Sequence, residues 1–598
     1  MARKKKKEIE FEPSEYQKAI FEYIEKGNGH LVVEAAAGSG KTYTIVKSLN
    51  YIPSDKKILM SAFNTDIVNE LKKKTKGIEN VDIRTLHSLG LMFLRTNNPR
   101  KKIEIDAYKY ESHIKNYISN YTSINIHRLN VKEYYRYLDN IKKFVDFGRY
   151  YLCQTPRDLD FIEQRYGIDT MADEKEASIG VMEWGKNNIS TVDYTDMVWL
   201  PNVLFLKPIG MLYDFIMVDE CQDMNKAERE LILKCFKMGT RLISVGDSQQ
   251  MLYSFAGGDP DSFNALKSIP NTICLPLSIS YRCAKNIVDF AKKIVPSIEA
   301  NDDGREGEIL ENVLLEEVKD GDMILCRNNA PLLQVYNSFL KMGRKAYIRG
   351  KDIGNNLKKI VKGTKQKALN VNCKEDGVFV RLYDDLFVLR NKMIENLGID
   401  EASVMKSPPI LNKLDIIKAL EILSEGINTT DELLEKIESI FSKKNKDEGV
   451  ALSTIHKAKG LEADNVYIVC KSLMPSKCAT KDWEIKQEYN LMYVAYTRAK
   501  NKLGFIDEKD FDDFDYVSSN NTKELKIKEE LVNKVLNKTT KVIINEETAK
   551  VIIMKAKNLN KAVTVKKKVE LDNSIGKTKM NSFSDILKNK RKKKQFYD

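Results

Sequence analysis

Six short apolar runs along the chain alternate with longer segments of helical spacing. Each run is apolar at almost every position and ends in polar or small residues: "HLVVEAAAGSG", "KILMSAFN", "YDFIMVDE", "RLISVGD", "DMILCRNN" and "NVYIVCKS". Such runs are typical of parallel strands that are buried on both faces and covered by helices. Because ligands of α/β proteins gather at the carboxyl ends of strands, we expect chemistry at Gly38–Thr42, Asn64, Asp219–Glu220 and Asp247.

Three other segments have a different character. Residues 96–190 show helical spacing in "VKEYYRYLDNIKKFVDF", and residues 356–444 show it in "IIKALEILSEGI" and "TDELLEKIESIF". We interpret both as helical insertions into α/β domains. Residues 511–598 are polar and Lys-rich and close in "KNKRKKKQFYD", so we expect little packed structure at their extreme end.

Size and charge narrow the class of protein. With 598 residues and 42% hydrophobic content, the chain has room for about three to five domains. Its net charge of +13 favours a polyanionic partner, nucleic acid first and a membrane surface second, although charge alone also fits simple solubility. The basic start "MARKKKKEIE" has no apolar segment behind it and is not a secretory signal. It fits a solvated tail at least as well as an arm that touches DNA.

The cysteine and histidine patterns argue against a disulfide scaffold or a zinc site. The nine cysteines are scattered, odd in number and free of any CxxC pair, and the five histidines are dispersed. These patterns favour a reducing interior of the cell. No apolar run approaches the ~20 residues that span a bilayer, so we expect no membrane partner.

The stretch "VVEAAAGSGKTYTIV", residues 32–46, predicts a strand, a tight loop of small residues and a helix that begins near Lys41. Glycines in such a loop let backbone N–H groups surround phosphate oxygens, and the helix N-terminus adds positive potential. Lys41 can reach the β and γ phosphates, and the Thr42 hydroxyl can ligate Mg²⁺. The stretch departs from the GxxxxGK[ST] consensus because Ala35 stands at the first Gly. The predicted nucleotide-binding residues of the loop are Ala37, Gly38, Ser39, Gly40, Lys41 and Thr42.

A second element supports the phosphate site. "FIMVDECQD" predicts an apolar strand that ends in Asp219 and Glu220. Asp219 would hold Mg²⁺, directly or through water, and Glu220 would polarise the attacking water as general base. A strand that merely ends in acidic residues explains this segment by itself, but it does not explain the pairing with a phosphate loop upstream.

The order of these and further motifs resembles that of superfamily 1 helicases of the UvrD/Rep/PcrA type. The matches run from residue 14 to about residue 505 in family order. They are "SEYQKAI" (Q motif), "SAFNTDIVNEL" (Ia), "IRTLHSLGL" (Ib), "VDECQDMN" (II), "VGDSQQMLYSFAGG" (III), "LSISYRC" (IV), "STIHKAKGLEADNVYIV" (V) and "YNLMYVAYTRAK" (VI). "AFN", "TLHSLG" and "DYTDMVWLP" resemble the branch of the F-box DNA helicase and viral relatives, although no F-box is apparent.

The resemblance implies an α/β fold with two RecA-like P-loop domains, each with a parallel sheet and a mainly helical insertion. The expected divisions are 1–95 and 191–276 for domain 1A, 96–190 for insertion 1B, 277–355 and 445–510 for domain 2A, 356–444 for a reduced insertion 2B, and 511–598 for a basic, partly disordered extension.

At the nucleotide site, the resemblance implies catalytic roles for Lys41, Asp219, Glu220, Gln250, Arg282 and Arg498, with ATP and Mg²⁺ as cofactors. Arg282 and Arg498 would be arginine fingers from the second domain, because an Arg fork matches phosphate bidentately. Gln250 would sense the γ-phosphate. Gln17 would read the adenine edge, Tyr281 would stack on the base, and Gly460 and Glu462 would meet the ribose. Tyr43 stands where the family usually has Arg, so two aromatic rings would clamp the base.

For DNA, the resemblance implies three stacking aromatics and five contacts to phosphates or sugars. The first set is Phe63, Tyr253 and Phe255, and the second is Asn64, Thr85, His87, Thr454 and His456. A motor that walks on any sequence needs such contacts rather than base-edge readout. Phe255 stands where the family often has Trp, and Ala256 where it often has Arg. Each aromatic by itself also fits a packed core.

The resemblance implies a monomeric enzyme that moves 3′→5′ on single-stranded DNA and binds junctions. It would act inside the cell, in the cytoplasm at the nucleoid or, in a eukaryotic or viral host, in the nucleus. Its cycle would drive strand separation or protein displacement. Two alternatives stay open, a translocase or recombination-disassembly factor without processive unwinding, and a helicase–nuclease. The tail could recruit a replication or repair protein through "SFSDILKNKRKKK", or it could attract DNA nonspecifically.

Overall fold

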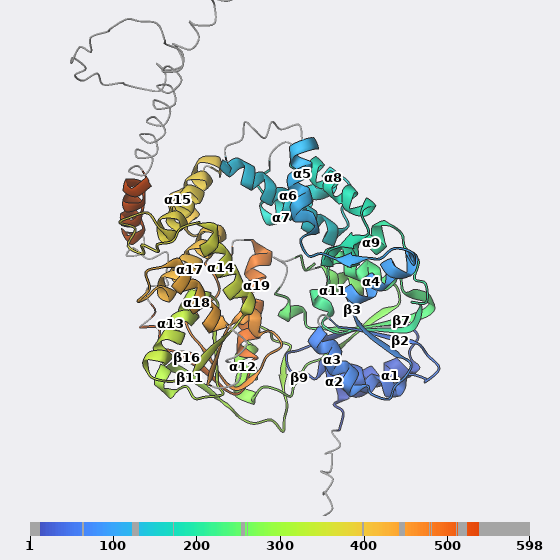
Figure 1. Ribbon diagram of the computed structural model, residues 1–598. Coiled ribbons are helices and arrows are strands. Elements are labelled where there is room, and N and C mark those ends of the chain that lie inside the picture. The colour runs from blue at the N-terminus through green and yellow to red at the C-terminus, as the bar shows by residue number, and fades with distance from the viewer. Residues whose placement is uncertain are drawn as a thin grey trace, which may run out of the picture. The chain divides into compact units, whose positions relative to one another are not determined.

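The computed structural model describes residues 12–62, 65–121, 131–170, 173–252, 257–259, 261–397, 400–441, 449–477, 479, 481–509, 511 and 523–536. The chain divides into two compact units, residues 1–532 and 533–598. The elements below belong to the first unit, which contains two lobes (Figure 1).

The first lobe is built on a parallel six-stranded sheet in the order β3-β2-β6-β7-β1-β8. Its strands are β1 (His30–Ala35), β2 (Ile58–Ala62), β3 (Val81–Thr85), β6 (Tyr213–Val218), β7 (Phe236–Gly246) and β8 (Thr272–Leu277). One face packs on α1 (Glu15–Lys26), α2 (Lys41–Ser48) and α3 (Thr65–Lys74). The other packs on α4 (Leu86–Asn97), α9 (Tyr194–Val203), α10 (Lys226–Leu233) and α11 (Ser262–Lys267). Apolar side chains on both faces explain why the central strands read as unbroken apolar runs.

Between α4 and α9, the described residues form a mainly helical layer on this lobe. It contains β4 (Glu104–Ile105), α5 (Lys109–Tyr121), α6 (Val131–Tyr151), α7 (Asp160–Tyr166) and α8 (Glu174–Asn187), and β4 pairs with β5 (Thr191–Val192). A buried polar cluster fixes the insertion to α9. Asp196 accepts hydrogen bonds from Lys109 Nζ (2.6 Å), Tyr110 Oη (2.7 Å) and Arg149 Nη1 (3.0 Å).

The second lobe is built on another parallel six-stranded sheet, in the order β11-β16-β15-β12-β14-β13. Its strands are β11 (Glu308–Val313), β12 (Met323–Cys326), β13 (Ala346–Arg349), β14 (Val450–Thr454), β15 (Ala463–Ile468) and β16 (Ala499–Ile506). Its core includes α12 (Lys285–Ala291) and α19 (Asp482–Tyr496). Ala36, Ala37 and Leu252 of the first lobe belong to the same apolar cluster, so the two lobes pack against each other.

A second group of helices lies between β13 and β14 in the sequence. It consists of α14 (Lys351–Gly363), α15 (Val378–Leu397), α16 (Glu401–Met405), α17 (Pro408–Leu423) and α18 (Thr430–Phe441), and α13 (Asn329–Lys341) packs on α17. Residues 523–532 are helical and also pack here. The Arg390 guanidinium donates two hydrogen bonds to the Glu529 carboxylate, of 2.9 and 2.6 Å. This contact between the C-terminal extension and the insertion was not predicted.

The fold class predicted from the sequence is confirmed, since all six apolar runs form strands of two parallel sheets. Both segments of helical spacing are mainly helical where they are described. Among the described residues, no helix is both long enough and apolar enough to cross a membrane.

Candidate active site

The phosphate loop lies at the end of β1, where the chain turns from strand to helix. Gly38 and Gly40 have φ values of +72° and +83°, a region that L side chains rarely adopt. A Cβ on Gly38 would lie 2.5 Å from the Cβ of Arg282, so this position also needs the small size of glycine. The Ser39 hydroxyl is buried and has no hydrogen-bond partner in the described part of the chain. These features form a cradle that leaves room for an acceptor-rich group such as phosphate.

The two acidic residues that follow β6 face this loop. Lys41 Nζ lies 3.0 Å from Glu220 Oε1, and Thr42 Oγ1 donates to Asp219 Oδ2 at 2.9 Å. Glu220 has a φ of +56°, a left-handed conformation for a residue with a side chain. Such strain persists where the surrounding structure holds it, and it clusters at functional sites.

Burial and the lysines set the protonation of these carboxylates. Burial raises the pKa of Asp219 to about 6, and the neighbouring Glu220 carboxylate contributes to that rise. Burial would also raise the pKa of Glu220, but the ammonium groups of Lys41 and Lys459 outweigh it and lower that pKa to about 2. Burial would lower the pKa of Lys41, but Glu220 and its acidic neighbours raise it. Glu220 is therefore ionised and Lys41 charged at neutral pH.

A chain of hydrogen bonds leads from Glu220 to the second lobe. Gln222 Nε2 donates to Glu220 Oε2, and Gln222 Oε1 accepts from the backbone N–H of Asp247 at 3.0 Å. Asp247 Oδ2 accepts from Gln250 Nε2 at 2.7 Å, and Gln250 Oε1 accepts from Arg498 Nη2 at 3.3 Å. Arg498 is almost fully buried. Its pKa is lowered to about 10 by burial and by the adjacent Arg282 charge, so it stays protonated.

Arg282 also lies beside the phosphate loop, but its side chain is bound within its own lobe. Its Nε donates to Glu462 Oε2 at 2.7 Å, and Lys500 Nζ lies 2.7 Å from Glu462 Oε1. Arg282 Nη1 donates to the Thr497 carbonyl at 3.4 Å. The predicted ribose ligand Glu462 is thus paired with the predicted arginine finger, a contact that the sequence did not indicate.

The predicted base-binding residues lie around the loop. Gln17 is buried and donates from Nε2 to Thr44 Oγ1 at 3.1 Å, which places it beside α2. The Tyr281 N–H donates to the Gly38 carbonyl at 2.9 Å. Tyr43 is partly exposed, with Lys47 Nζ 5.7 Å from its ring centre. Gly460 has a φ of +83° and open space at its Cβ position.

The predicted DNA contacts divide into two groups. Thr85 and Thr454 end β3 and β14 and precede helical turns, and Thr85 Oγ1 caps α4 by accepting from the Ser88 N–H at 3.1 Å. His87 and His456 follow, both partly exposed. Burial lowers the pKa of each, that of His456 to about 4. Phe63, Asn64, Tyr253 and Phe255 lie outside the described residues.

Three residues that sequence reasoning missed join the lobes. The Ala37 N–H donates to the Tyr493 hydroxyl at 2.9 Å. Lys459 Nζ forms an ion pair with Asp223 and donates to the Gln250 carbonyl at 2.9 Å. Asn490 Nδ2 donates to the Met251 carbonyl at 3.1 Å. All three lie inside motifs V and VI, but a motif alone does not say which of its side chains crosses a cleft.

Comparison with known proteins fits this geometry. The family model of the UvrD/REP helicase N-terminal domain matches residues 16–270, and that of the UvrD-like helicase C-terminal domain matches residues 345–510. The chain is 24% identical to the ATP-dependent DNA helicase PcrA of Staphylococcus aureus, over 81% of this chain and 82% of that protein. It is 23% identical to the PcrA of Staphylococcus epidermidis, over the same shares. The chain belongs to the UvrD/Rep family of superfamily 1 helicases.

Proposed function

We propose that this protein is an ATP-dependent DNA helicase that hydrolyses ATP between its two lobes and moves 3′→5′ along single-stranded DNA. The observation that carries the proposal is the hydrogen-bond chain from Glu220 through Gln222, Asp247 and Gln250 to Arg498. It links the proposed general base in one lobe to a buried arginine of the other. A change at the phosphates therefore has a direct route to the relative position of the lobes. The direction of movement rests on the family.

The residues present fit Mg²⁺. Thr42 and Asp219 bring two oxygen ligands within 2.9 Å of each other beside the phosphate cradle. The described residues include no cluster of three or more His, Cys, Asp or Glu that could hold a metal, and Mg²⁺ commonly takes one or two protein ligands and fills its shell with water and substrate phosphates. When bound there, Mg²⁺ would neutralise charge on the β and γ phosphates.

Lys41 and Glu220 would change partners when ATP binds. Lys41 now neutralises Glu220, and the phosphates would compete for the same ammonium group. Once Lys41 turns towards the phosphates, Glu220 loses the main charge that lowers its pKa and becomes a stronger base. It is then placed to hold and deprotonate the attacking water. Arg498, and Arg282 after release from Glu462, would stabilise the negative charge of the transition state.

We further propose that the divisions expected from the sequence are functional domains, with 1–95 and 191–276 as 1A, 96–190 as 1B, 277–355 and 445–510 as 2A, and 356–444 as 2B. The stacking roles of Phe63, Tyr253 and Phe255 and the phosphate contacts of the other DNA residues remain part of this proposal. We expect a monomer that acts inside the cell on single strands and junctions. A replication or repair partner for residues 511–598 also remains a proposal.

One experiment tests the motor. Phosphate release is measured with and without an oligo-dT strand for the wild type and Arg498→Ala. We expect DNA to stimulate the wild type and the variant to lose ~10³-fold in rate. Arg305→Ala, an exposed arginine of the second lobe, is the matched control and should behave as the wild type. Equal hydrolysis in all conditions would overturn the proposal.

A second function is favoured by the size of insertion 2B, in which the described residues form helices α14–α18. A translocase that strips proteins without processive unwinding needs less duplex contact than a processive helicase. Forked-duplex unwinding measured beside DNA-stimulated ATPase separates the two, because strong hydrolysis without unwinding indicates the translocase. Incubating labelled DNA with the protein and Mg²⁺ checks the helicase–nuclease alternative, which requires residues 511–598.

A further inference from the structure

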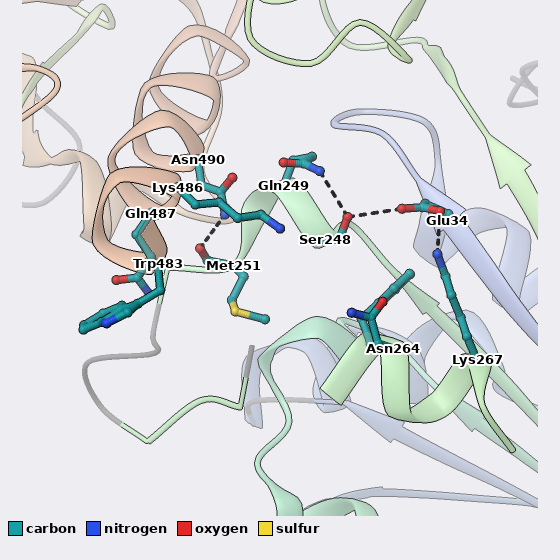
Figure 2. A pocket seen from close by; sticks show the side chains of 11 residues that line it. Glu34, Ser248, Gln249, Met251, Asn264, Lys267, Trp483, Lys486, Gln487 and Asn490 are labelled. Atoms are coloured by element: carbon teal, nitrogen blue, oxygen red, sulfur yellow. Dashed lines mark hydrogen bonds and ion pairs between the residues drawn. The ribbon is translucent and has the colours of Figure 1, made fainter. Parts of the chain in front are cut away.

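A cavity of about 250 Å³, with both apolar and polar side chains in its lining, lies between the two lobes, where α19 faces the end of β7 and the turn that follows it. The first lobe contributes Ser248, Asn264 and Lys267, and α19 contributes Trp483, Lys486 and Gln487. Figure 2 shows the Lys486 side chain pointing from α19 towards Ser248 across the cavity. The motor cycle described above uses none of these six side chains.

Several hydrogen-bond donors at this cavity have no acceptor in the described part of the chain. Trp483 Nε1 and Gln487 Nε2 are buried and unpartnered. Beside them, the Arg165 guanidinium of α7 lies 5.5 Å from the Trp483 ring, and its Nε and Nη2 are also buried and unpartnered. Native proteins rarely leave buried donors unpaired, and each such group calls for an explanation. Four donors from two elements indicate a missing ligand that is rich in acceptors.

The charge around the cavity indicates that this ligand is anionic. Lys486 is exposed and has no ion-pair partner among the described residues. Glu34, the one carboxylate that lines the cavity within the described ranges, already accepts from Lys267 Nζ at 2.9 Å and from Ser248 Oγ at 3.2 Å. Lys486 in the cavity lining and Arg165 beside the Trp483 ring therefore present two cations that this carboxylate does not neutralise.

Contacts between α7 and α19 hold these donors in place. Lys481, the residue before α19, donates from Nζ to the carbonyls of Arg165 (2.8 Å) and Gln164 (3.4 Å). This joins insertion 1B to the second lobe. Near the middle of the same helix, the Asn490 bond to Met251 joins it to the first lobe. A ligand that lies along α19 would thus contact both lobes.

We propose that Arg165, Trp483, Lys486 and Gln487 bind the phosphodiester backbone of single-stranded DNA as it passes between α7 and α19. This inference rests on the proposed function. A phosphate fits better than a base, because each of the unpartnered groups described above is a donor. In addition, Arg165 already lies near the Trp483 ring and Tyr166 contacts it edge-on at 6.4 Å. The indole would therefore act through its N–H and not as a stacking platform.

The first test is Lys486→Ala. Anisotropy of a labelled dT strand, titrated at several salt concentrations, gives the dissociation constant and its salt dependence. We expect about fivefold weaker binding, and a salt slope lower by about 0.7, which corresponds to one fewer phosphate neutralised on a single strand. Lys292→Ala, which removes a partly exposed lysine just after α12 that pairs with Asp289, should change neither. An abasic strand should lose the same factor, and a loss confined to strands with bases would overturn the backbone assignment.

The second test uses the tryptophans. The chain has three, and Trp184 stacks on His113 while Trp199 is fully buried, so Trp483 should report the bound strand. We expect dT to change the intrinsic fluorescence of the wild type but not that of Trp483→Phe, which keeps a ring and loses the donor. A wild type that binds DNA while both variants bind equally well, with unchanged salt slopes, overturns this inference alone. A wild type that binds no DNA overturns the proposed function and this inference with it.

Discussion

The ammonium group of Lys459 lies against the carboxylate of Asp223, and this buried ion pair joins the second lobe to the loop behind the proposed general base. Lys459 also donates to the Gln250 carbonyl at 2.9 Å. Its charge contributes to the low pKa of Glu220. One side chain of motif V thus contacts motif II and motif III together, across the contact between the lobes.

Replacing Lys459 by Ala should therefore impair the closed state. Removing one member of a buried pair costs about 3–5 kcal/mol, of which Asp223 recovers part by taking up a proton. We expect the DNA-stimulated kcat to fall at least about tenfold, measured by steady-state phosphate release. Lys457→Ala is the control, since that exposed ammonium pairs with Asp352 inside the second lobe. An unchanged kcat in Lys459→Ala would rule out a role in closure.

The strands and the phosphate site could be predicted from the sequence because local rules determine them. An apolar run of about five to eight residues between polar ends has few ways to be buried other than a parallel strand. The loop before Lys41 needs glycines at positive φ, and both Gly38 and Gly40 have it. Asp219 meets Thr42 because parallel strands bring their carboxyl ends to one edge.

The contacts between the lobes could not be predicted in this way. The sequence places Glu462 in a motif, but not against Arg282. Nor does it distinguish Tyr493, which crosses to the Ala37 N–H, from Tyr489, which is exposed on the same helix. Such pairings depend on the orientation of whole domains, a long-range property that no local pattern encodes.

Tyr493→Phe should weaken the coupling between nucleotide and second lobe. It removes the hydroxyl that accepts from the Ala37 N–H and leaves that buried donor without this partner when the lobes are together. The loss of one such bond, about 0.5–1.5 kcal/mol, should lower kcat/KM for ATP by about two- to tenfold. Tyr489→Phe, at an exposed position of α19, should leave kcat/KM unchanged. Equal values for the two variants would contradict a role of Tyr493 in the cleft.

Gly38→Ala should abolish hydrolysis without unfolding either lobe. The new methyl group would lie 2.5 Å from Arg282 Cβ and 2.9 Å from Ser280 Oγ, in addition to the strain of φ +72°. Gly210→Ala is the matched control, because Gly210 has φ +73° with no atom within 4 Å. Both should lower the melting temperature through backbone strain of about 1–2 kcal/mol. Only Gly38→Ala should lose ATPase activity. If Gly38→Ala kept activity near the wild-type level, the lobes would not meet at this position during turnover.

Glu228 should make the first lobe less stable as pH rises. Burial, assisted by the Asp223 charge, raises the pKa of this carboxyl from 4.5 to about 7, and the nearby His87, 4.0 Å away, also has a pKa lowered by burial. Between pH 4.5 and 7 the unfolded chain releases the proton while the folded chain keeps it, so stability falls across this window. The full cost, on the order of 3 kcal/mol, applies above about pH 7.

Glu228→Gln removes that titration and keeps an oxygen for the Asn225 N–H, which caps α10. The difference in melting temperature, Glu228→Gln minus wild type, should therefore be larger at about pH 8 than at about pH 5. Differential scanning calorimetry at both pH values measures the change, with Glu230→Gln on the same helix as control. A difference that stays constant with pH would show that Glu228 does not retain its proton in the folded protein.

Removal of residues 537–598 should change DNA affinity more than catalysis. This segment, which lies outside the described residues, carries 17 Lys and Arg and six Asp and Glu, so it holds +11 of the net charge of +13. The remaining chain is nearly neutral, and its hold on DNA must come from local cations rather than from a long-range field. We expect a chain ending at Leu536 to bind duplex DNA more weakly, with a smaller salt slope, while the kcat at saturating dT stays within about twofold. Unchanged affinity together with a lost kcat would assign the tail a part in the motor itself.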